Sequence, residues 1–466
     1  MSEERRLDLM RELGAWAAVA IVVGTMIGTG IFIVPANMAQ TVKTPGLVYA
    51  VWIAGGILTL FGTFAYGELG AAIPEAGGEY AYISRGFGPV WGFLFGWMHS
   101  IVGRSSSIAT IAAGLLLFWG FLDPHVLMPL HTFHFTLPWE SGPSAFVFTL
   151  AMPLAVGVIA LVTFVNYLGV KLGGQVQVAL TVIKVAVIAA VIFAGFALGA
   201  HPAAALAAPQ GLVGGATVGG FFAALVAALW AYDGWDNLGL VGAEIKNPAR
   251  NIPRSLIGGV ALVMALYIFT TGACFHVLPF SKVAASPHVV SDVLARVAGS
   301  HVADWLTIAM IICALGTLNS SILSGARVDY AMARDRRFFR IADGIHPRFR
   351  TPGNALIFQA CLASILALTG TFTQLFSLYI FVQFIFYALA AASVLRLRRK
   401  EPDLPRPYRT WGYPVVPVIF ILGAIAVSAS VLVEQPLRAG LGLFVIVIGL
   451  FFYRYWRARD AARPVA

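Results

Sequence analysis

The chain is dominated by apolar runs of 18 residues or more, the length that an α-helix needs to cross a lipid bilayer. Only 11% of its 466 residues are charged, whereas soluble proteins carry about 25%. The runs lack the short alternating pattern of a membrane barrel. The sequence therefore predicts an all-α integral membrane protein embedded in the lipid bilayer.

Twelve transmembrane helices are predicted from these runs. The first is expected to be retained as a span, because no small-residue cleavage site follows it. The predicted spans cover residues 14–38, 45–71, 89–120, 145–166, 172–198, 217–242, 256–278, 302–333, 353–369, 371–396, 412–433 and 438–456.

Lysine and arginine are unevenly distributed among the segments that connect these spans. When the boundary residues Arg396, Arg438 and Arg454 are counted with the adjoining segments, 24 of the 31 basic residues lie in the termini and alternate loops, and only 4 lie in the other loops. Basic residues concentrate on the cytoplasmic side of a membrane. We therefore expect both termini, residues 1–13 and 457–466, to be cytoplasmic in a multi-pass protein of the cell (inner) membrane. This placement explains the net charge of +10 without nucleic acid as a partner.

The first span contains the glycine-rich stretch Gly24-Thr25-Met26-Ile27-Gly28-Thr29-Gly30. Each glycine costs about 1 kcal/mol in a helix interior, and non-helical backbone in a membrane is tolerated only inside protein or beside a cavity. One interpretation is a broken helix whose free backbone groups bind a substrate. The other is a packing face, because the pair Gly24 and Gly28 is also a helix-contact motif.

A second interruption lies in the sixth span, in the segment Leu229-Trp230-Ala231-Tyr232-Asp233-Gly234-Trp235-Asp236-Asn237. Paired interruptions in two halves of a transporter indicate a binding site between inverted repeats. We therefore expect residues 14–199 and 217–396 to form two inverted five-helix repeats, with two additional helices in residues 412–456.

Broken helices suggest a zwitterionic ligand. Carbonyl groups that end a half-helix suit an ammonium group, and the N–H groups that begin one suit a carboxylate. Free carbonyl groups are expected around Met26, Trp230 and Asp233. Free N–H groups are expected around Gly28, Thr29 and Gly30. An α-amino acid matches both.

Ionisable and polar side chains inside the spans are functional candidates. Lys184 lies near the middle of the fifth span, Arg104 in the third and Asp236 in the sixth. Arg104 approaches the substrate side chain or forms a structural pair, and Asp236 is either a protonatable switch or one half of a buried ion pair. Asn319 and Ser320 in the eighth span either coordinate an ion or bond neighbouring helices.

No cofactor, metal site or catalytic group is predicted. The segment 121–143 contains three histidines, but their spacing fits no metal motif and we expect a solvated loop. The spans contain no pair of nucleophile and base, so an enzyme is not expected.

Several long motifs occur in order along almost the whole chain. They are GTMIGTGIF, YGELGAAIPEAGGEYAYISRGFGPVWGFLFGW, LWAYDGWDNLGLVGAEIKNPARNIPRS, LGTLNSSILSGARVDYAMARD and RLRRKEPDLPRPYRTWGYPVVP. They resemble the amino acid–polyamine–organocation superfamily of permeases, in its bacterial L-type amino acid transporter branch. The resemblance implies a five-plus-five inverted-repeat (LeuT-like) fold with helices 1 and 6 discontinuous.

The resemblance also implies a site. It places the substrate carboxylate on Thr29 and the backbone of Gly28 and Gly30, within the stretch that includes Ile27. The amino group falls on the carbonyls of Met26, Trp230 and Asp233, beside Tyr232 and Gly234. Trp230 matches the position where relatives carry an aromatic side chain that closes over the substrate. Asp233 stands where many relatives have glycine, so the resemblance does not fix the identity of the substrate.

In sodium-independent members of this family, a lysine at the place of Lys184 puts its ammonium where sodium sits in sodium-coupled relatives. A buried amine gives up its proton more readily, which opens a route to proton coupling. Relatives that bind a heavy chain use a cysteine in the loop that corresponds to 121–143. That segment contains none, so no disulfide-linked heavy chain is expected.

The sequence thus predicts an alternating-access, sodium-independent exchanger of neutral amino acids. Two alternatives stay open at this point, a proton-coupled symporter and a non-transporting amino acid sensor on the same fold.

Overall fold

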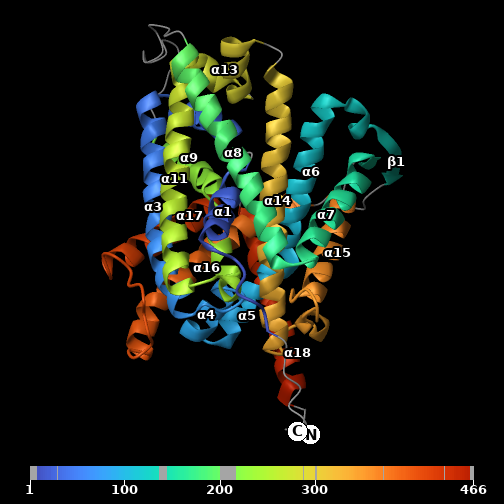
Figure 1. Ribbon diagram of the computed structural model, residues 1–466, viewed down its shortest axis with the longest axis vertical. Coiled ribbons are helices and arrows are strands. Elements are labelled where there is room, and N and C mark those ends of the chain that lie inside the picture. Colours follow the sequence, from blue (N-terminus) through green and yellow to red (C-terminus); the bar gives the residue numbers. More distant parts are fainter. Residues whose placement is uncertain are drawn as a thin grey trace.

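The computed structural model describes residues 8–28, 30–135, 144–199, 217–286, 288–299, 302–370, 372–434 and 436–461. These residues form a bundle of long helices (Figure 1). Helix α4 (Glu79–Phe87) lies at one end of the bundle and helix α13 (Val289–Ala298) at the other. We name these the α4 end and the α13 end.

Eight helical stretches among the described residues are long and apolar enough to cross a membrane, and a ninth is a bent pair of helices. The bent pair is α1 (Ala15–Met26) with α2 (Gly30–Val42). The eight stretches comprise α3 (Pro45–Ala72), α5 (Pro89–Trp97) continued by a π-helical segment (Met98–Arg104) and α6 (Ser105–Leu122), α8 (Val170–Leu198), α11 (Pro248–Val277), α14 (Val302–Arg334), α16 (Phe372–Lys400), α17 (Val415–Glu434) and α18 (Pro436–Ala461).

Three shorter apolar helices occupy the places of the remaining predicted spans. They are α7 (Ala151–Tyr167), α9 (Val218–Ala231) and α15 (Gly353–Thr369). The chain is therefore a multi-pass helical membrane protein, whereas the count of twelve spans and the inverted repeat stay predictions.

The prediction of a solvated loop over residues 121–143 is wrong in its first part. A 3₁₀ turn (Pro124–Leu127) is followed by β1 (Pro129–Phe135), which pairs antiparallel with β2 (Ser144–Thr149). Both segments are rich in aromatic and β-branched residues, which favour strands. Helix α7 consequently begins at Ala151, later than the predicted position 145.

The short remaining elements connect the spans. They are α10 (Asn237–Leu240), α12 (Phe280–Ala285) and the 3₁₀ turns Gly242–Glu244 and Arg340–Asp343.

Local chemistry sets several helix boundaries. The side chain of Thr44 accepts a hydrogen bond from the backbone of Leu47 and caps α3, whose first residue is a proline. Helix α11 begins at Pro248, eight residues before the predicted boundary at 256, because Asn247 adopts a left-handed conformation immediately before it. The predicted loop after the sixth span is thus largely helical.

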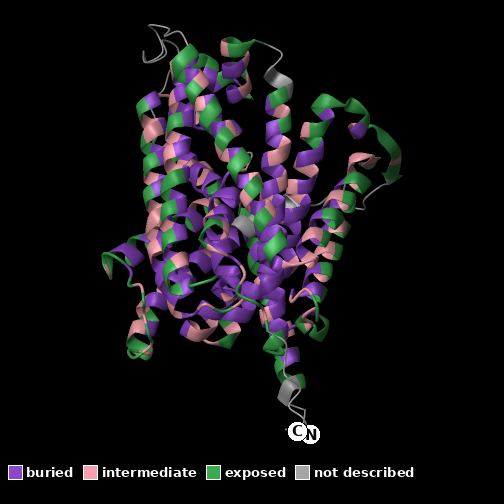
Figure 2. Ribbon diagram, in the orientation of Figure 1, coloured by how far each residue is buried: buried purple, intermediate pink, exposed green. Residues whose placement is uncertain are grey.

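Helix α1 lies at the centre of the bundle. It packs against α8, α11 and α14, and its residues are buried from Ala20 to Met26. Figure 2 shows the buried residues concentrated along this central region, whereas exposed positions follow the outer helices. The glycine-rich stretch at the end of α1 therefore lies inside the protein.

Candidate functional site

The first predicted break is present. Helix α1 ends at Met26 and α2 begins at Gly30, at an angle of 42°. A Cβ atom on Gly24 would lie 2.2 Å from Thr181 Oγ1 of α8, whereas one on Gly28 would meet nothing closer than 3.6 Å. Gly24 therefore serves helix packing, whereas a Cβ atom on Gly28 would make only an ordinary contact with Thr317. Thr29 lies outside the described residues.

The second break directly contacts the first. Helix α9 ends at Ala231 and α10 begins at Asn237. Between them Gly234 has φ of +100°, a conformation that side chains rarely adopt. A Cβ atom there would lie 2.5 Å from Thr25 Cγ2 of α1. Glycine is thus needed both for the turn and for the close approach of the two broken helices.

A tyrosine hydroxyl joins the two half-helix ends. Tyr267 Oη of α11 lies 2.7 Å from the carbonyl oxygen of Met26 and 2.9 Å from that of Ala231. A hydroxyl carries one proton and donates to one acceptor at a time. The N–H of Gly28 also donates to Met26 O, at 2.9 Å. Of the three carbonyl oxygens expected to bind an ammonium group, that of Met26 thus already accepts hydrogen bonds, and that of Trp230 accepts one from Asp233 N at 3.2 Å.

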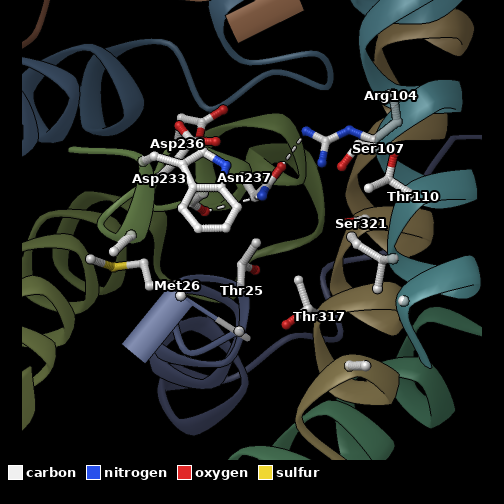
Figure 3. A pocket seen from close by; sticks show the side chains of 18 of the residues that line it. Thr25, Met26, Arg104, Ser107, Thr110, Asp233, Asp236, Asn237, Thr317 and Ser321 are labelled. Carbon is white, nitrogen blue, oxygen red and sulfur yellow. Dashed lines mark hydrogen bonds between the residues drawn. The ribbon is translucent and has the colours of Figure 1, made fainter. Parts of the chain in front are cut away.

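A cavity of about 310 Å³ lies between the two breaks and α6, α14 and α16. Figure 3 shows Arg104 on one side of it and Asp233 and Asp236 on the other, with Thr25 and Met26 beneath. Eight residues of the predicted site line this cavity: Met26, Gly28, Gly30, Arg104, Trp230, Asp233, Gly234 and Asp236.

Four other predicted residues support the cavity from outside its lining. Ile27 and Tyr232 are fully buried, and the Tyr232 hydroxyl donates to the carbonyl of Trp52. Ser320 shares a hydrogen bond of 2.5 Å with Thr25. Asn319 donates to Gln177 Oε1 at 2.9 Å and to the carbonyl of Gly173. The structural-pair interpretation of Asn319 and Ser320 therefore fits their contacts.

The side chain of Lys184 is fully buried between α8, α1 and α14. Its Nζ donates to the carbonyls of Gly24 at 2.7 Å and Ile27 at 2.8 Å, and to Thr317 Oγ1 at 3.0 Å. Gly316 permits this approach, because a Cβ there would lie 2.6 Å from Lys184 Cε. Lys184 therefore binds the carbonyl groups left free at the end of α1 and does not snorkel to the surface.

Arg104 is buried at the end of the π-helical segment. Its Nη2 donates to Asn237 Oδ1 at 2.5 Å, and its Nε to His99 Nε2 at 3.4 Å. Among the described residues it forms no ion pair, and neither does Asp236. Tyr387 Oη donates to Asp233 Oδ1 at 2.6 Å. Asp233 thus bonds a neutral group. The ion-pair interpretation of Asp236 has no partner among the described residues, and the protonatable switch stays a prediction.

Several lining residues have no clear signal in the sequence. Ser107, Thr110 and Phe118 lie on α6, whereas Gln383 and Tyr387 lie on α16. A polar residue within an apolar span was the available signal for Gln383. Phe118 and Tyr387 could not be identified as cavity residues from the sequence, because aromatic residues are common in every span.

A buried ion pair lies between the central cavity and the α4 end. Arg327 Nε and Nη2 donate to the two carboxylate oxygens of Glu244 at 2.8 and 3.0 Å. The residues around Leu13, before α1, pair with the segment Glu244–Lys246, and we call this pairing the strap. Leu13 N donates to Glu244 O, and Lys246 N donates to Leu13 O. Leu13 is 1% exposed, so this strap is an integral part of the packing.

The chain matches the family model described as amino acid permease over residues 13–452. It is 32% identical to the serine/threonine exchanger SteT of Bacillus subtilis, over 97% of this chain and 98% of that protein. It is 29% identical to the human b(0,+)-type amino acid transporter 1, over 99% of this chain and 92% of that protein. It is also 30% identical to the human large neutral amino acids transporter small subunit 2, over 96% and 81% respectively.

The match spans both helix breaks and nearly every span, and the relatives are amino acid transporters or exchangers by name. The central cavity, the two broken helices and this similarity lead to one conclusion: the chain belongs to the amino acid permease family.

Proposed function

We propose that this protein is a sodium-independent exchanger of small or branched neutral amino acids, working by alternating access around the central cavity. The observation that carries the proposal is the meeting of two broken helices at one cavity of about 310 Å³. Pockets for small molecules range over about 300–1,000 Å³, so this one suits a single small ligand.

The lining supports an amino acid. Gly28 and Gly30 expose backbone at one end, and the carbonyl of Met26 lies beside them. Ile111 and Phe118 of α6 form an apolar wall that suits an uncharged side chain. We assign the carboxylate to the Gly28–Gly30 stretch and the ammonium group to the carbonyls around Met26 and Trp230, with Trp230 as an aromatic gate.

Sodium independence rests on Lys184. Its ammonium group already supplies a positive charge to the carbonyls of Gly24 and Ile27, at 2.7 and 2.8 Å. These are oxygen ligands that a hard cation would otherwise use. We propose that Lys184 replaces a coupling ion.

A second candidate is exchange of amino acids with a cationic side chain. The carboxylate of Asp233 lines the cavity, and it forms no ion pair with a described lysine or arginine. An unpaired carboxylate at this place attracts a cationic group of the substrate.

The membrane arrangement is part of the proposal. We propose twelve spans from the apolar runs, two inverted repeats from the paired breaks, and cytoplasmic termini in the inner membrane of the cell from the bias of basic residues. The segment 121–143 contains no cysteine, so we expect no disulfide-linked heavy chain.

Uptake by proteoliposomes tests the proposal. The purified full chain is reconstituted without sodium, and labelled serine, leucine or arginine is added outside. We expect rapid uptake only when the vesicles contain unlabelled amino acid. Uptake into empty vesicles driven by a proton gradient would instead indicate symport. Binding without accumulation would indicate a sensor.

A further inference from the structure

Four carboxyl groups surround the single guanidinium of Arg104. Glu79, Asp236 and Asp329 are 1%, 3% and 2% exposed, and Asp233 lines the cavity beside them. Arg104 is close enough to interact electrostatically with all four. If all were ionised, this buried region would carry a large uncompensated negative charge, which is energetically prohibitive.

Other buried acids of this protein are paired. Glu244 receives two hydrogen bonds from Arg327, and Glu68 receives two from Arg398, at 2.9 and 2.6 Å. Among the described residues, none of the four carboxyls around Arg104 has such a partner. The region around Arg104 is therefore short of positive charge, in contrast to the rest of the interior.

Glu79, the first residue of α4, is only partly compensated. Its Oε1 accepts a hydrogen bond of 2.8 Å from Tyr66 Oη, and its Oε2 is buried with no partner among the described residues. An ionised carboxylate offers about four acceptor sites, so one neutral hydroxyl satisfies little of it. Burial and the nearby charge of Asp236 raise the pKa of the Glu79 carboxyl well above its usual range, against a lowering by the Tyr66 hydrogen bond.

We propose that Glu79 is a proton-binding site, and that loss of its proton sets the upper pH limit of exchange. The inference rests on the proposed exchange function. The ionisable groups that face Glu79 come from five parts of the structure: Tyr66 of α3, Tyr82 of α4, Arg104 of the π-helical segment, Asp233 and Asp236 of the second break, and Tyr387 of α16, which packs on Tyr66.

Two tyrosines connect Glu79 to Asp233, which lines the cavity. The rings of Tyr66 and Tyr387 are in edge contact at 6.2 Å, and their hydroxyls bond Glu79 and Asp233 respectively. On the other side, the next residue, Tyr80, lines a cleft of about 720 Å³ at the α4 end. Ionisation transfers the proton of the Glu79 carboxylic acid to water and leaves a carboxylate close to Asp236 and Asp233.

The direction of the pH effect follows because only the protonated Glu79 carboxyl is compatible with the observed arrangement of the two breaks. Below the raised pKa of Glu79 the carboxyl is neutral and the arrangement of the two breaks is retained. Above that pKa, a new buried charge repels Asp233 and Asp236. With equal pH on both sides of the vesicle, exchange should then fall by about tenfold per pH unit.

The test compares Glu79→Gln with Glu75→Gln in the proteoliposome assay, using whichever of serine, leucine or arginine the wild type exchanges fastest. Glutamine mimics the neutral acid, so Glu79→Gln should remove the alkaline decline. Glu75 lies in the same connection and lines the solvent cleft, so Glu75→Gln should keep the wild-type profile. An alkaline decline retained in Glu79→Gln would overturn the proposal.

A spectroscopic measurement covers the case in which Glu79→Gln does not fold. Infrared spectra of the wild-type protein at neutral pH should contain the C=O stretch of a buried protonated carboxyl, and it should disappear as the pH rises. Glu79→Asp keeps a titratable group and should shift this transition along the pH axis. Absence of the band would overturn the proton site. Absence of exchange at every pH, with the band present, would overturn only the transport function.

Discussion

Two buried cations flank the cavity, and the protein holds them in different ways. Lys184 donates three hydrogen bonds to neutral oxygens, two of them backbone carbonyls of α1. Arg104 donates to a neutral amide and an imidazole, although four carboxyl groups lie close to it. Among the described residues, Lys184 bonds only neutral oxygens, whereas Arg104 has four carboxyl groups nearby and forms an ion pair with none of them.

This difference indicates that Lys184 and Arg104 have different roles. Lys184 completes the broken end of α1, so its charge is part of the architecture of the break. Arg104 offsets only part of the negative charge around the second break. That region consequently retains the capacity to accept a further positive charge, from a proton or from a substrate.

Removal of Lys184 should have the largest effect. In Lys184→Ala the carbonyls of Gly24 and Ile27 lose a charged donor, and such a hydrogen bond contributes about 2 kcal/mol. Turnover should fall by about thirtyfold, with a smaller change in substrate affinity. Exchange rates and equilibrium binding measure the two effects. Lys171→Ala, at an exposed position of the same helix, is the matched control, and unchanged turnover in Lys184→Ala would contradict the structural role.

Removal of Arg104 should destabilise the protein in a pH-dependent manner. Arg104→Gln leaves the surrounding carboxyl groups without their shared cation, at a cost of about 3 kcal/mol in the free energy of unfolding. The cost should shrink as the pH falls, because protonated carboxyls no longer need a cation. Unfolding in detergent at several pH values measures this.

The control for Arg104 is Arg250→Gln, at an exposed position of α11. Equal destabilisation by Arg104→Gln at acid and alkaline pH would show that Arg104 acts through packing alone. The contrast with Lys184 would then disappear.

Asp233→Asn should change substrate preference more than stability. Removing the carboxylate removes its attraction for a cationic side chain, worth about 1.4 kcal/mol, or tenfold in the preference for arginine over leucine. Exchange of leucine should change little. Competition assays with both amino acids measure this, with the exposed Asp343→Asn as control. An unaltered preference would exclude Asp233 from selectivity.

Replacing sodium with choline should have the smallest effect. Lys184 Nζ already donates hydrogen bonds to the oxygens of Gly24, Ile27 and Thr317, which a sodium ion would otherwise bind. No change in exchange rate is therefore expected. A strict sodium requirement would show that these oxygens are not the whole of the ion site.

The two breaks could be predicted from the sequence because glycine and intramembrane acids stand out against apolar residues. The helix ends at Met26 and Ala231, and the buried position of Lys184, agree with that interpretation. The first outer strand was missed, because a pair of short strands depends on its partner segment as much as on its own residues.

The surroundings of Arg104 could not be predicted. Its hydrogen-bond partner Asn237 is 133 residues away, and Glu79 approaches from a connection that composition marks only as charged. Likewise Tyr387 and Gln383 enter the cavity from α16 because of how that helix packs. Such contacts follow from tertiary packing, which single-sequence patterns do not contain.

The strap at Leu13 offers a way to measure movement of the protein during transport. Its two backbone hydrogen bonds, at 2.9 and 2.8 Å, attach the residues before α1 to Glu244 and Lys246. Any separation of these two segments during transport has to break both hydrogen bonds. A pair of dyes attached at Glu12 and Lys246, whose Oε2 and Nζ atoms lie 3.5 Å apart, is therefore suited to following single transport cycles in real time.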